Sequence, residues 1–208
     1  MGLSSASRTY RSPLRQEQAA TTRQRICAVA ARLFEAHGYG QTSIALIARE
    51  AGVSAQTVYD AFTNKRGLAR AVLDRVTSGD DVPRILATLP SVGDPLAVVQ
   101  ITAQVTRRIL ERGASAVNAM RRADDQELVA EWRSWEQRRY QGQQLVIDAL
   151  SALGALRPDR AAAEHLDVLW ALSGRDLYDL LVVERGWSAD RYEQWLTEAL
   201  AHELLARA

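Results

Sequence analysis

The sequence predicts an all-α protein of about nine helices in two domains, because apolar residues recur at helical spacing along most of the chain. Hydrophobic residues make up 47% of the 208 positions, enough for a substantial core. Residues 1–78 carry 10 Arg and 1 Lys against 5 acidic residues, net +6, whereas residues 79–208 carry 15 Arg against 20, net −5. A helix-breaking stretch from Ser78 to Pro83 separates the two parts. Only the basic part is therefore expected to meet a polyanion.

The N-terminal residues 1–16 mix Ser, Arg and Pro without periodicity and are predicted to form a disordered tail. Arg8, Arg11 and Arg15 lie close together there, so the tail is either inert or adds phosphate or minor-groove contacts. The domain proper is predicted at residues 17–78.

An amphipathic first helix is predicted from Glu17 to His37, where Gly38 and the following residues end it. Its apolar positions repeat at the spacing of one helical face: Ile26, Val29, Ala30, Leu33 and Phe34. Cys27 lies beside this stripe, and a single cysteine excludes an internal disulfide. We interpret it as a buried, inert thiol rather than a redox sensor.

Two short amphipathic segments follow, joined by a turn at residues 51–54, and this pattern is typical of a helix-turn-helix. Thr42 or Ser43 is placed to cap the first helix, and Ser54 to cap the second. Gly52 stands where a helix C-terminus favours a residue tolerant of left-handed backbone angles.

The second short helix is predicted to show a polar face to solvent. Val58, Ala61 and Phe62 fall on one side, while Gln56 and Asp60 fall on the other. Glutamine reads base edges through two hydrogen bonds, and Thr and Tyr hydroxyls suit phosphate oxygens. The only lysine of the chain begins the next helix, whose N-terminus also favours a phosphate. The residues expected to contact duplex DNA are Thr42, Ser43, Ser54, Ala55, Gln56, Thr57, Tyr59, Asp60 and Lys65.

The run from Arg23 to Lys65 closely resembles the DNA-binding domain of the TetR family of transcriptional regulators. It reads R-x-x-I-x-x-x-A-x-x-L-F-x-x-x-G-Y-x-x-T-S-I-x-x-I-A-x-x-A-G-V-S-x-x-T-V-Y-x-x-F-x-x-K, and the resemblance covers residues 20–77. It implies a homodimer that binds a palindromic operator, and a fourth helix whose tilt carries a signal from a ligand domain.

Two residues within this run leave alternatives open. Tyr39 either packs or reaches a phosphate. Asp60 departs from the family pattern, in which an aromatic residue, Arg or Asn is common at that place. Its carboxylate either accepts a hydrogen bond from cytosine or pairs with an arginine such as Arg49 and leaves DNA untouched.

The remaining chain, residues 79–208, is predicted to form an effector-binding and dimerisation domain of further helices. Asp94 and Pro95 begin one that reaches about Arg112. A short helix from Ser115 to Arg122 and a long one over residues 125–153 follow. An eighth helix is predicted from Pro158 to about Glu184, and a ninth after Ser188.

The last two helices are joined by a tight turn and should pair antiparallel. In proteins that the chain resembles, this pair packs against its copy in a second subunit. The alternative is that their apolar stripes are consumed by the protein's own core. We favour a homodimer, because a helix-turn-helix with one short reading helix needs a second half-site. The expected interface residues are Leu177, Leu181, Tyr192, Trp195, Leu196 and Leu200.

The C-terminal helices also carry aromatic and polar residues suited to a small-molecule pocket. We expect a small apolar or aromatic effector, with contacts drawn from Asn118, Arg121, Trp132, Trp135, Trp170 and Asp176. Asp176 interrupts the apolar stripe of the eighth helix, although it could instead form a surface ion pair.

Catalytic and metal-binding patterns are missing from the sequence. We find no Glu-x-x-His pairs, nucleophile elbow, P-loop or dinucleotide-binding glycines, so no catalytic residue, metal or cofactor is predicted. No apolar run spans a bilayer and the start lacks a signal-peptide core, which predicts a cytoplasmic protein without membrane contact. The sequence thus favours a DNA-binding repressor released by a small ligand. The alternatives are a constitutive or activating regulator without an effector, and an all-α enzyme.

Overall fold

In the computed structural model the described residues are 13–78, 81–112, 114–121 and 126–206. They divide into two compact units between Val72 and Leu73. This division falls inside a helix, before the boundary predicted at residues 78 and 79. Within the described residues the structure is helical apart from one isolated bridge between Leu156 and Leu205, so the predicted all-α class is confirmed.

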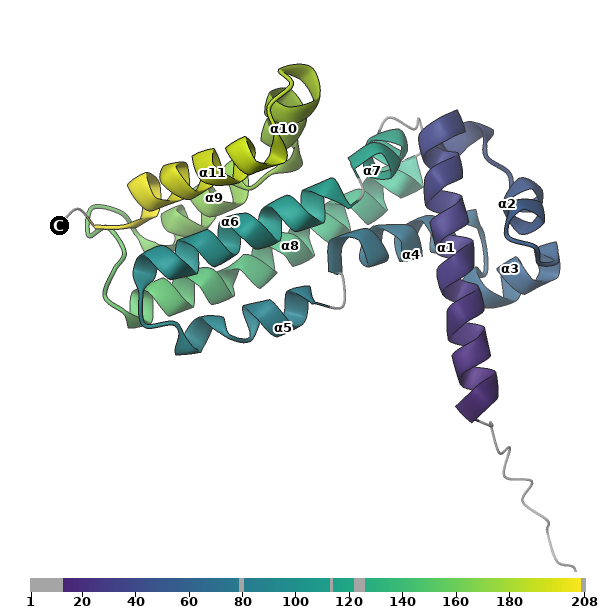
Figure 1. The fold of residues 1–208 in the computed structure, drawn as a ribbon, viewed down its shortest axis with the longest axis horizontal. Coiled ribbons are helices and arrows are strands. Elements are labelled where there is room, and N and C mark those ends of the chain that lie inside the picture. The colour runs from purple at the N-terminus through teal and green to yellow at the C-terminus, as the bar shows by residue number, and fades with distance from the viewer. Residues whose placement is uncertain (1–12, 79–80, 113, 122–125, 207–208) are drawn as a thin grey trace, which may run out of the picture. The chain divides into compact units, whose positions relative to one another are not determined.

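The N-terminal unit is built from α1, α2, α3 and the first part of α4 (Figure 1). Their bounds are Pro13–Gln41, Ile44–Glu50, Ala55–Phe62 and Lys65–Ser78. Residues 13–16, predicted to belong to the tail, are helical, and the rest of that tail lies outside the described residues. Gly38 has a φ of +79°, a conformation that favours glycine, and it interrupts α1 where an end was predicted.

The core of this unit forms where the apolar stripe of α1 meets α2, α3 and α4. Its members were grouped by spacing alone, and their burial confirms the predicted period. They include Ile26, Ala30, Leu33, Phe34, Ile47, Val58, Phe62 and Leu68. Cys27 is buried in the same stripe, as predicted.

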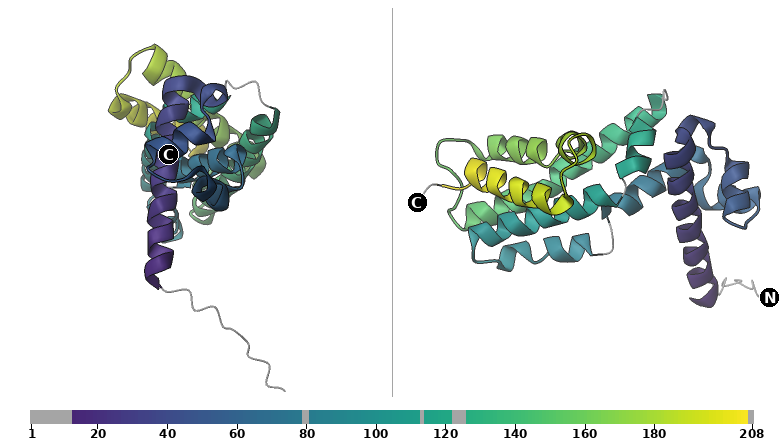
Figure 2. Two further views of the ribbon diagram at one scale, coloured as in Figure 1. Left: turned by 90° about the vertical axis from the view of Figure 1, so that its right-hand side faces the viewer. Right: turned by 45° about the horizontal axis from the view of Figure 1, so that its top comes forward.

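The C-terminal unit is formed mainly by four long helices that run side by side: α6, α8, α9 and α11 (Figures 1 and 2). Their bounds are Pro95–Glu111, Gln126–Ala152, Ala162–Leu172 and Ala189–Leu204. The shorter α5, η1, α7 and α10 span Val82–Leu86, Leu89–Ser91, Ala114–Arg121 and Arg175–Tyr178. Neither α5 nor η1 was expected, because the stretch after Ser78 reads as a helix breaker.

The eighth predicted helix is broken in the structure. Its first part is α9, which ends at Leu172, and α10 follows after Ser173 and Gly174. A π-helical segment, η2, then covers Asp179–Glu184, where the Arg185 N–H donates to the carbonyl of Leu180 five residues earlier. Glycine at the N-cap of α10 and the wider π turn explain why one continuous helix does not form.

Candidate nucleic-acid interface and ligand cavity

The turn between α2 and α3 is set by local capping. The Ser43 hydroxyl oxygen accepts a hydrogen bond from the Leu46 N–H at 3.1 Å, and that of Ser54 accepts from the Thr57 N–H at 3.1 Å. Gly52, with a φ of +63°, reverses the chain between the helices. Ser43, not Thr42, therefore caps the first helix, and the predicted cap of the second is confirmed.

Helix α3 has one buried and one bare side. Val58 and Phe62 are buried in the core of the N-terminal unit. On the other side Ser54, Ala55, Gln56 and Asp60 are exposed, Thr57 is half-buried, and Tyr59 is 47% exposed. The face predicted to read DNA is thus accessible in the described chain.

The amide of Gln56 is oriented by its neighbour one turn on. Its Nε2 donates to Asp60 Oδ1 at 2.7 Å. The ion pair found for Arg49 is with Glu50, at 3.7 Å, and not with Asp60. The contact of Asp60 with cytosine stays a prediction. The hydrogen bond to Asp60 uses one N–H of Gln56, and the amide oxygen and the second N–H remain available for hydrogen bonds.

Thr42 does not belong to the exposed surface. Its side chain is 0% exposed, and its hydroxyl lies 2.9 Å from the Gly38 carbonyl and 3.2 Å from that of Leu33. The expectation that Thr42 contacts DNA through its side chain is wrong. Its hydroxyl instead satisfies carbonyl groups at the interrupted end of α1.

Lys65 lies at the first position of α4 over an aromatic ring. Its Nζ is 4.1 Å from the ring centre of Tyr39 and 3.4 Å from the carbonyl oxygen of Gly40. Tyr39 is buried against Phe34, so the packing interpretation of Tyr39 is the correct one. The half-buried ammonium group is held at the start of a helix, where a phosphate is also favoured.

Two residues that sequence reasoning missed support α3. The Arg23 guanidinium donates to the carbonyl of Ala61 and lies 4.2 Å from the ring centre of Phe62, which fixes the end of α3 to α1. Gly67 sits in the first turn of α4, where an added Cβ would lie 2.1 Å from the carbonyl oxygen of Phe62. Both lie within residues 20–77, which the family resemblance covers, but spacing alone does not reveal their contacts.

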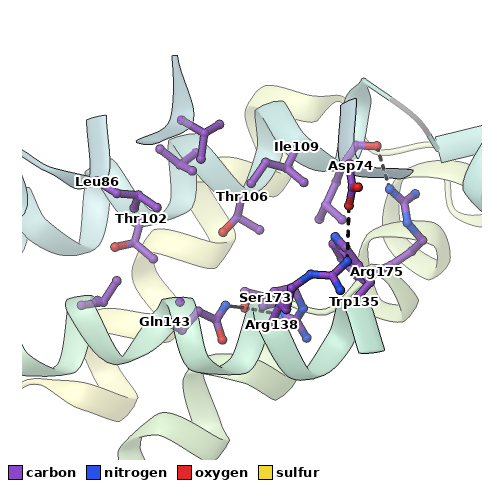
Figure 3. Close-up of a pocket in the computed structure, with 16 residues that line it drawn as sticks. Asp74, Leu86, Thr102, Thr106, Ile109, Trp135, Arg138, Gln143, Ser173 and Arg175 are labelled. Carbon is purple, nitrogen blue, oxygen red and sulfur yellow. Dashed lines mark hydrogen bonds and ion pairs between the residues drawn. The ribbon is translucent and has the colours of Figure 1, made fainter. Parts of the chain in front are cut away.

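The C-terminal unit contains a cavity of about 290 Å³, shown in Figure 3. Threonines and aliphatic residues of α6 line the cavity opposite Gly142, Gln143 and Val146 of α8. Several of these side chains are short, and they do not fill the space between the two helices. Its apolar lining is Val82, Leu86, Val105, Ile109, Leu110, Trp135 and Val146, and its polar lining includes Thr102, Thr106, Gln143, Ser173, Asp74 and three arginines. Size and mixed lining suit a small ligand.

Of the residues predicted to bind a ligand, only Trp135 lines this cavity. Trp132, Trp170, Arg121 and Asp176 line a second, more polar hollow, where Arg121 forms an ion pair with Asp176 at 2.7 Å. Asn118 lines neither of them. The ion-pair alternative considered for Asp176 is the one found, although its partner is Arg121 rather than a neighbouring residue.

A hydrogen-bond chain crosses the polar end of the cavity. Gln143 Nε2 donates to the Ser173 hydroxyl oxygen at 2.7 Å (Figure 3). Arg139 Nη1 donates to the same oxygen at 3.1 Å, and that hydroxyl donates to the Leu169 carbonyl at 2.6 Å. Burial lowers the pKa of Arg139, and the nearby carboxylate of Glu136 opposes that shift. The chain ties α8 to the break between α9 and α10.

The expected dimer residues separate into two groups. Tyr192, Leu196 and Leu200 are 0% exposed in the core of their own unit, so the expectation that they contact a second copy is wrong. Leu181 and Trp195 are partly buried against the same core, and Leu177 is half-buried. The exposed apolar positions of this segment are instead Leu180 and Val183, which lie on η2.

In the described part of the chain, no group of three His, Cys, Asp or Glu side chains is placed to hold a metal ion. None of the described helices is long and apolar enough to cross a bilayer.

The N-terminal unit is similar in sequence to known proteins. Residues 26–72 match the family model for bacterial regulatory proteins of the tetR family. Over 46 residues the chain is 54% identical to the HTH-type transcriptional repressor ComR of Escherichia coli K12, a match that spans 22% of either protein.

Solved structures share the whole fold. NalD, the secondary repressor of the MexAB-OprM multidrug efflux pump in Pseudomonas aeruginosa, is 22% identical with a TM-score of 0.71, and the match covers 91% of this chain and 100% of NalD. The complex of SmeT with triclosan, SmeT being the repressor of a Stenotrophomonas maltophilia efflux pump, is 18% identical with a TM-score of 0.71 and coverages of 90% and 93%. A Saccharomonospora viridis protein solved in complex with choline is 24% identical with a TM-score of 0.69, and the match covers 90% of this chain and 100% of that protein. At these identities the likeness concerns the fold.

Proposed function

We propose that this chain, a member of the tetR family of bacterial regulatory proteins through its N-terminal domain, is a transcriptional repressor that a small ligand releases from a palindromic operator. The observation that carries this proposal is the bare side of α3, where Gln56 and Tyr59 are exposed while Val58 and Phe62 hold the helix from behind. A short helix supported in this way is suited to enter a major groove.

Electrostatics supports the same assignment. The net charge of +6 is confined to residues 1–78, and the net charge of residues 79–208 is −5. Contacts to phosphates dominate affinity for DNA, so the basic part of the chain is attracted to the duplex and the acidic part is repelled by it. Within the basic unit, Lys65 and the Tyr59 hydroxyl are the groups that we expect to contact phosphates.

We expect two copies to bind together, because one reading helix covers a single half-site. The exposed apolar residues of η2 give a place for the pairing, since Val183 is 61% exposed. Replacing Val183 by Asp should yield monomers in light scattering, with Glu184→Gln as a matched surface control. An unchanged dimer mass in Val183→Asp would remove η2 from the interface.

Release by a ligand is supported by the cavity between α6 and α8. Ligand binding shifts the protein between two states only by its differential affinity for them. The direct test of the proposal is selection of bound sites from random duplex DNA with the full chain. We expect a palindrome whose half-sites lie about one helical turn apart. Recovery of no common sequence would refute sequence-specific binding.

A regulator without an effector is the second candidate, since its N-terminal unit would be the same. The two are separated by adding candidate ligands to the protein bound to its selected site. Release of the DNA supports the effector-controlled repressor, and continued binding across all ligands supports the constitutive one.

A further inference from the structure

A buried guanidinium with unused hydrogen-bonding capacity lines the cavity. Arg175 is 4% exposed, and its Nη2 donates to the carbonyl of Leu110 at 3.3 Å. Its Nη1 lies 3.6 Å from Asp179 Oδ1, too far for a hydrogen bond. Among the described residues, neither Nε nor Nη1 has a hydrogen-bond partner. Donors left unsatisfied in a buried charged group are costly, so this arrangement calls for an acceptor from outside the chain.

The charges of the wall indicate which kind of acceptor fits. Arg138, Arg139 and Arg175 line the cavity, whereas Asp74 is the one carboxylate among the residues that the structure places in its wall. Asp74 is engaged by Arg138, with 3.3 Å between Nη2 and Oδ1. An entering cation would therefore meet guanidinium groups, and an anion would be attracted to them.

The other residues of the cavity wall indicate that the rest of the ligand is apolar. Leu86, Val105, Ile109 and Val146 give an aliphatic surface, and the indole of Trp135 adds an aromatic one. Such a surface favours an apolar chain or ring through the area that it removes from water. A ligand that satisfies both parts of the wall is apolar with one anionic end.

We propose that the effector of this cavity is a small monocarboxylate with an apolar body, whose carboxylate accepts hydrogen bonds from Arg175. This assignment rests on the proposed function, because it specifies the ligand of the same effector site. Burial lowers the pKa of the Arg175 guanidinium, an effect that the charge of Asp179 opposes. A bound carboxylate would favour the charged form of Arg175, because it would accept hydrogen bonds from the buried donors Nε and Nη1.

The test uses the full chain and three eight-carbon probes that differ only in the polar end: octanoate, octan-1-ol and octylammonium. Isothermal titration calorimetry at neutral pH gives the affinity for each probe. A hydrogen bond to a charged group should make octanoate bind about ten- to a hundred-fold more tightly than octan-1-ol. Octylammonium should bind most weakly of the three.

Replacing Arg175 by Gln should reduce the affinity for octanoate to that for octan-1-ol, while the affinity for octan-1-ol stays the same. Arg84→Gln is the matched control, since Arg84 is exposed, lies outside the cavity wall and loses the same charge. If Arg175→Gln does not fold, as judged by circular dichroism, the order of the three probes on the unmodified chain decides alone. Equal or tighter binding of octan-1-ol or octylammonium, or no binding of octanoate at millimolar concentration, overturns the proposal.

The outcome is separable from that of the proposed function. Octanoate that binds but leaves the DNA complex intact supports the carboxylate site and counts against effector control. A selected palindrome together with no octanoate binding supports the regulator and refutes the carboxylate site.

Discussion

Replacing Gln56 by Ala tests how the bare side of α3 recognises DNA. The side chain is exposed, and its one hydrogen bond within the described chain is to Asp60. Truncation leaves Val58 and Phe62 in place, so we expect the free energy of unfolding to change by at most about 0.5 kcal/mol. Loss of DNA affinity can then be attributed to the removed amide rather than to unfolding.

The magnitude follows from the groups that remain available. One N–H of Gln56 is directed to Asp60, which leaves the second N–H and the carbonyl oxygen, the pair that adenine N7 and N6 require. A bidentate contact of this kind contributes roughly 1 to 3 kcal/mol, so two half-sites lose roughly 2 to 6 kcal/mol. The operator affinity should therefore fall by about thirty-fold or more.

Fluorescence anisotropy on the selected operator, and on operators with one symmetric base pair changed at a time, measures this loss. The Gln56→Ala protein should become indifferent to one base pair while it still discriminates at the others. Asp60→Asn is the control, because asparagine keeps an acceptor for Gln56 and removes only the charge. That variant should retain the base preference and bind random DNA more tightly at low salt. A Gln56→Ala protein that discriminates at every position like the unmodified chain would refute the assignment.

Three further predictions concern stability. Gly67→Ala should destabilise the N-terminal unit by about 1 to 3 kcal/mol or more in urea unfolding, because its Cβ would overlap the Phe62 carbonyl; wild-type stability would contradict the close approach. Arg112 lowers the pKa of Asp81 to about 2, so the stability from this carboxylate is present above the usual pKa of 3.8 and is lost as the pH falls through about 2; an acid-unfolding curve unchanged by Asp81→Asn would count against the pair. Leu196→Asp should lower the free energy of unfolding of the C-terminal unit by more than about 4 kcal/mol, because Leu196 is fully buried, and should not give a folded monomer. Circular dichroism together with light scattering distinguishes an unfolded protein from a folded monomer.

Local signals in the sequence predicted the helix caps and the buried side of α3. Capping by Ser43, Ser54 and Asp94 depends on a few neighbouring residues, and each hydroxyl or carboxylate accepts from the backbone N–H two or three residues on. The buried side of α3 follows from a period of 3.6 residues. Such features need no knowledge of which helix packs against which.

Features that depend on packing between distant helices were missed. Periodicity gave Tyr192, Leu196 and Leu200 an apolar face but could not tell whether a second copy or the same chain covers it. The cavity lies between α6 and α8, so its lining residues cannot be predicted from the pattern of a single segment. The burial of Thr42 was missed for another reason. Its hydroxyl donates to the carbonyls of Gly38 and Leu33 at the interrupted end of α1, and spacing does not reveal that contact.

The π turn in η2 acts as a one-residue insertion within a helical path. Every side chain after it is rotated by about 100° from where an unbroken α-helix would place it. Leu180 and Val183 lie within this segment and face water, and α11 follows the turn at Gly186 with Tyr192 directed inward. Deleting Val182 should therefore restore ordinary helical winding and redirect Val183, which would alter the dimer contact proposed for η2 without changing the chemistry of any remaining side chain.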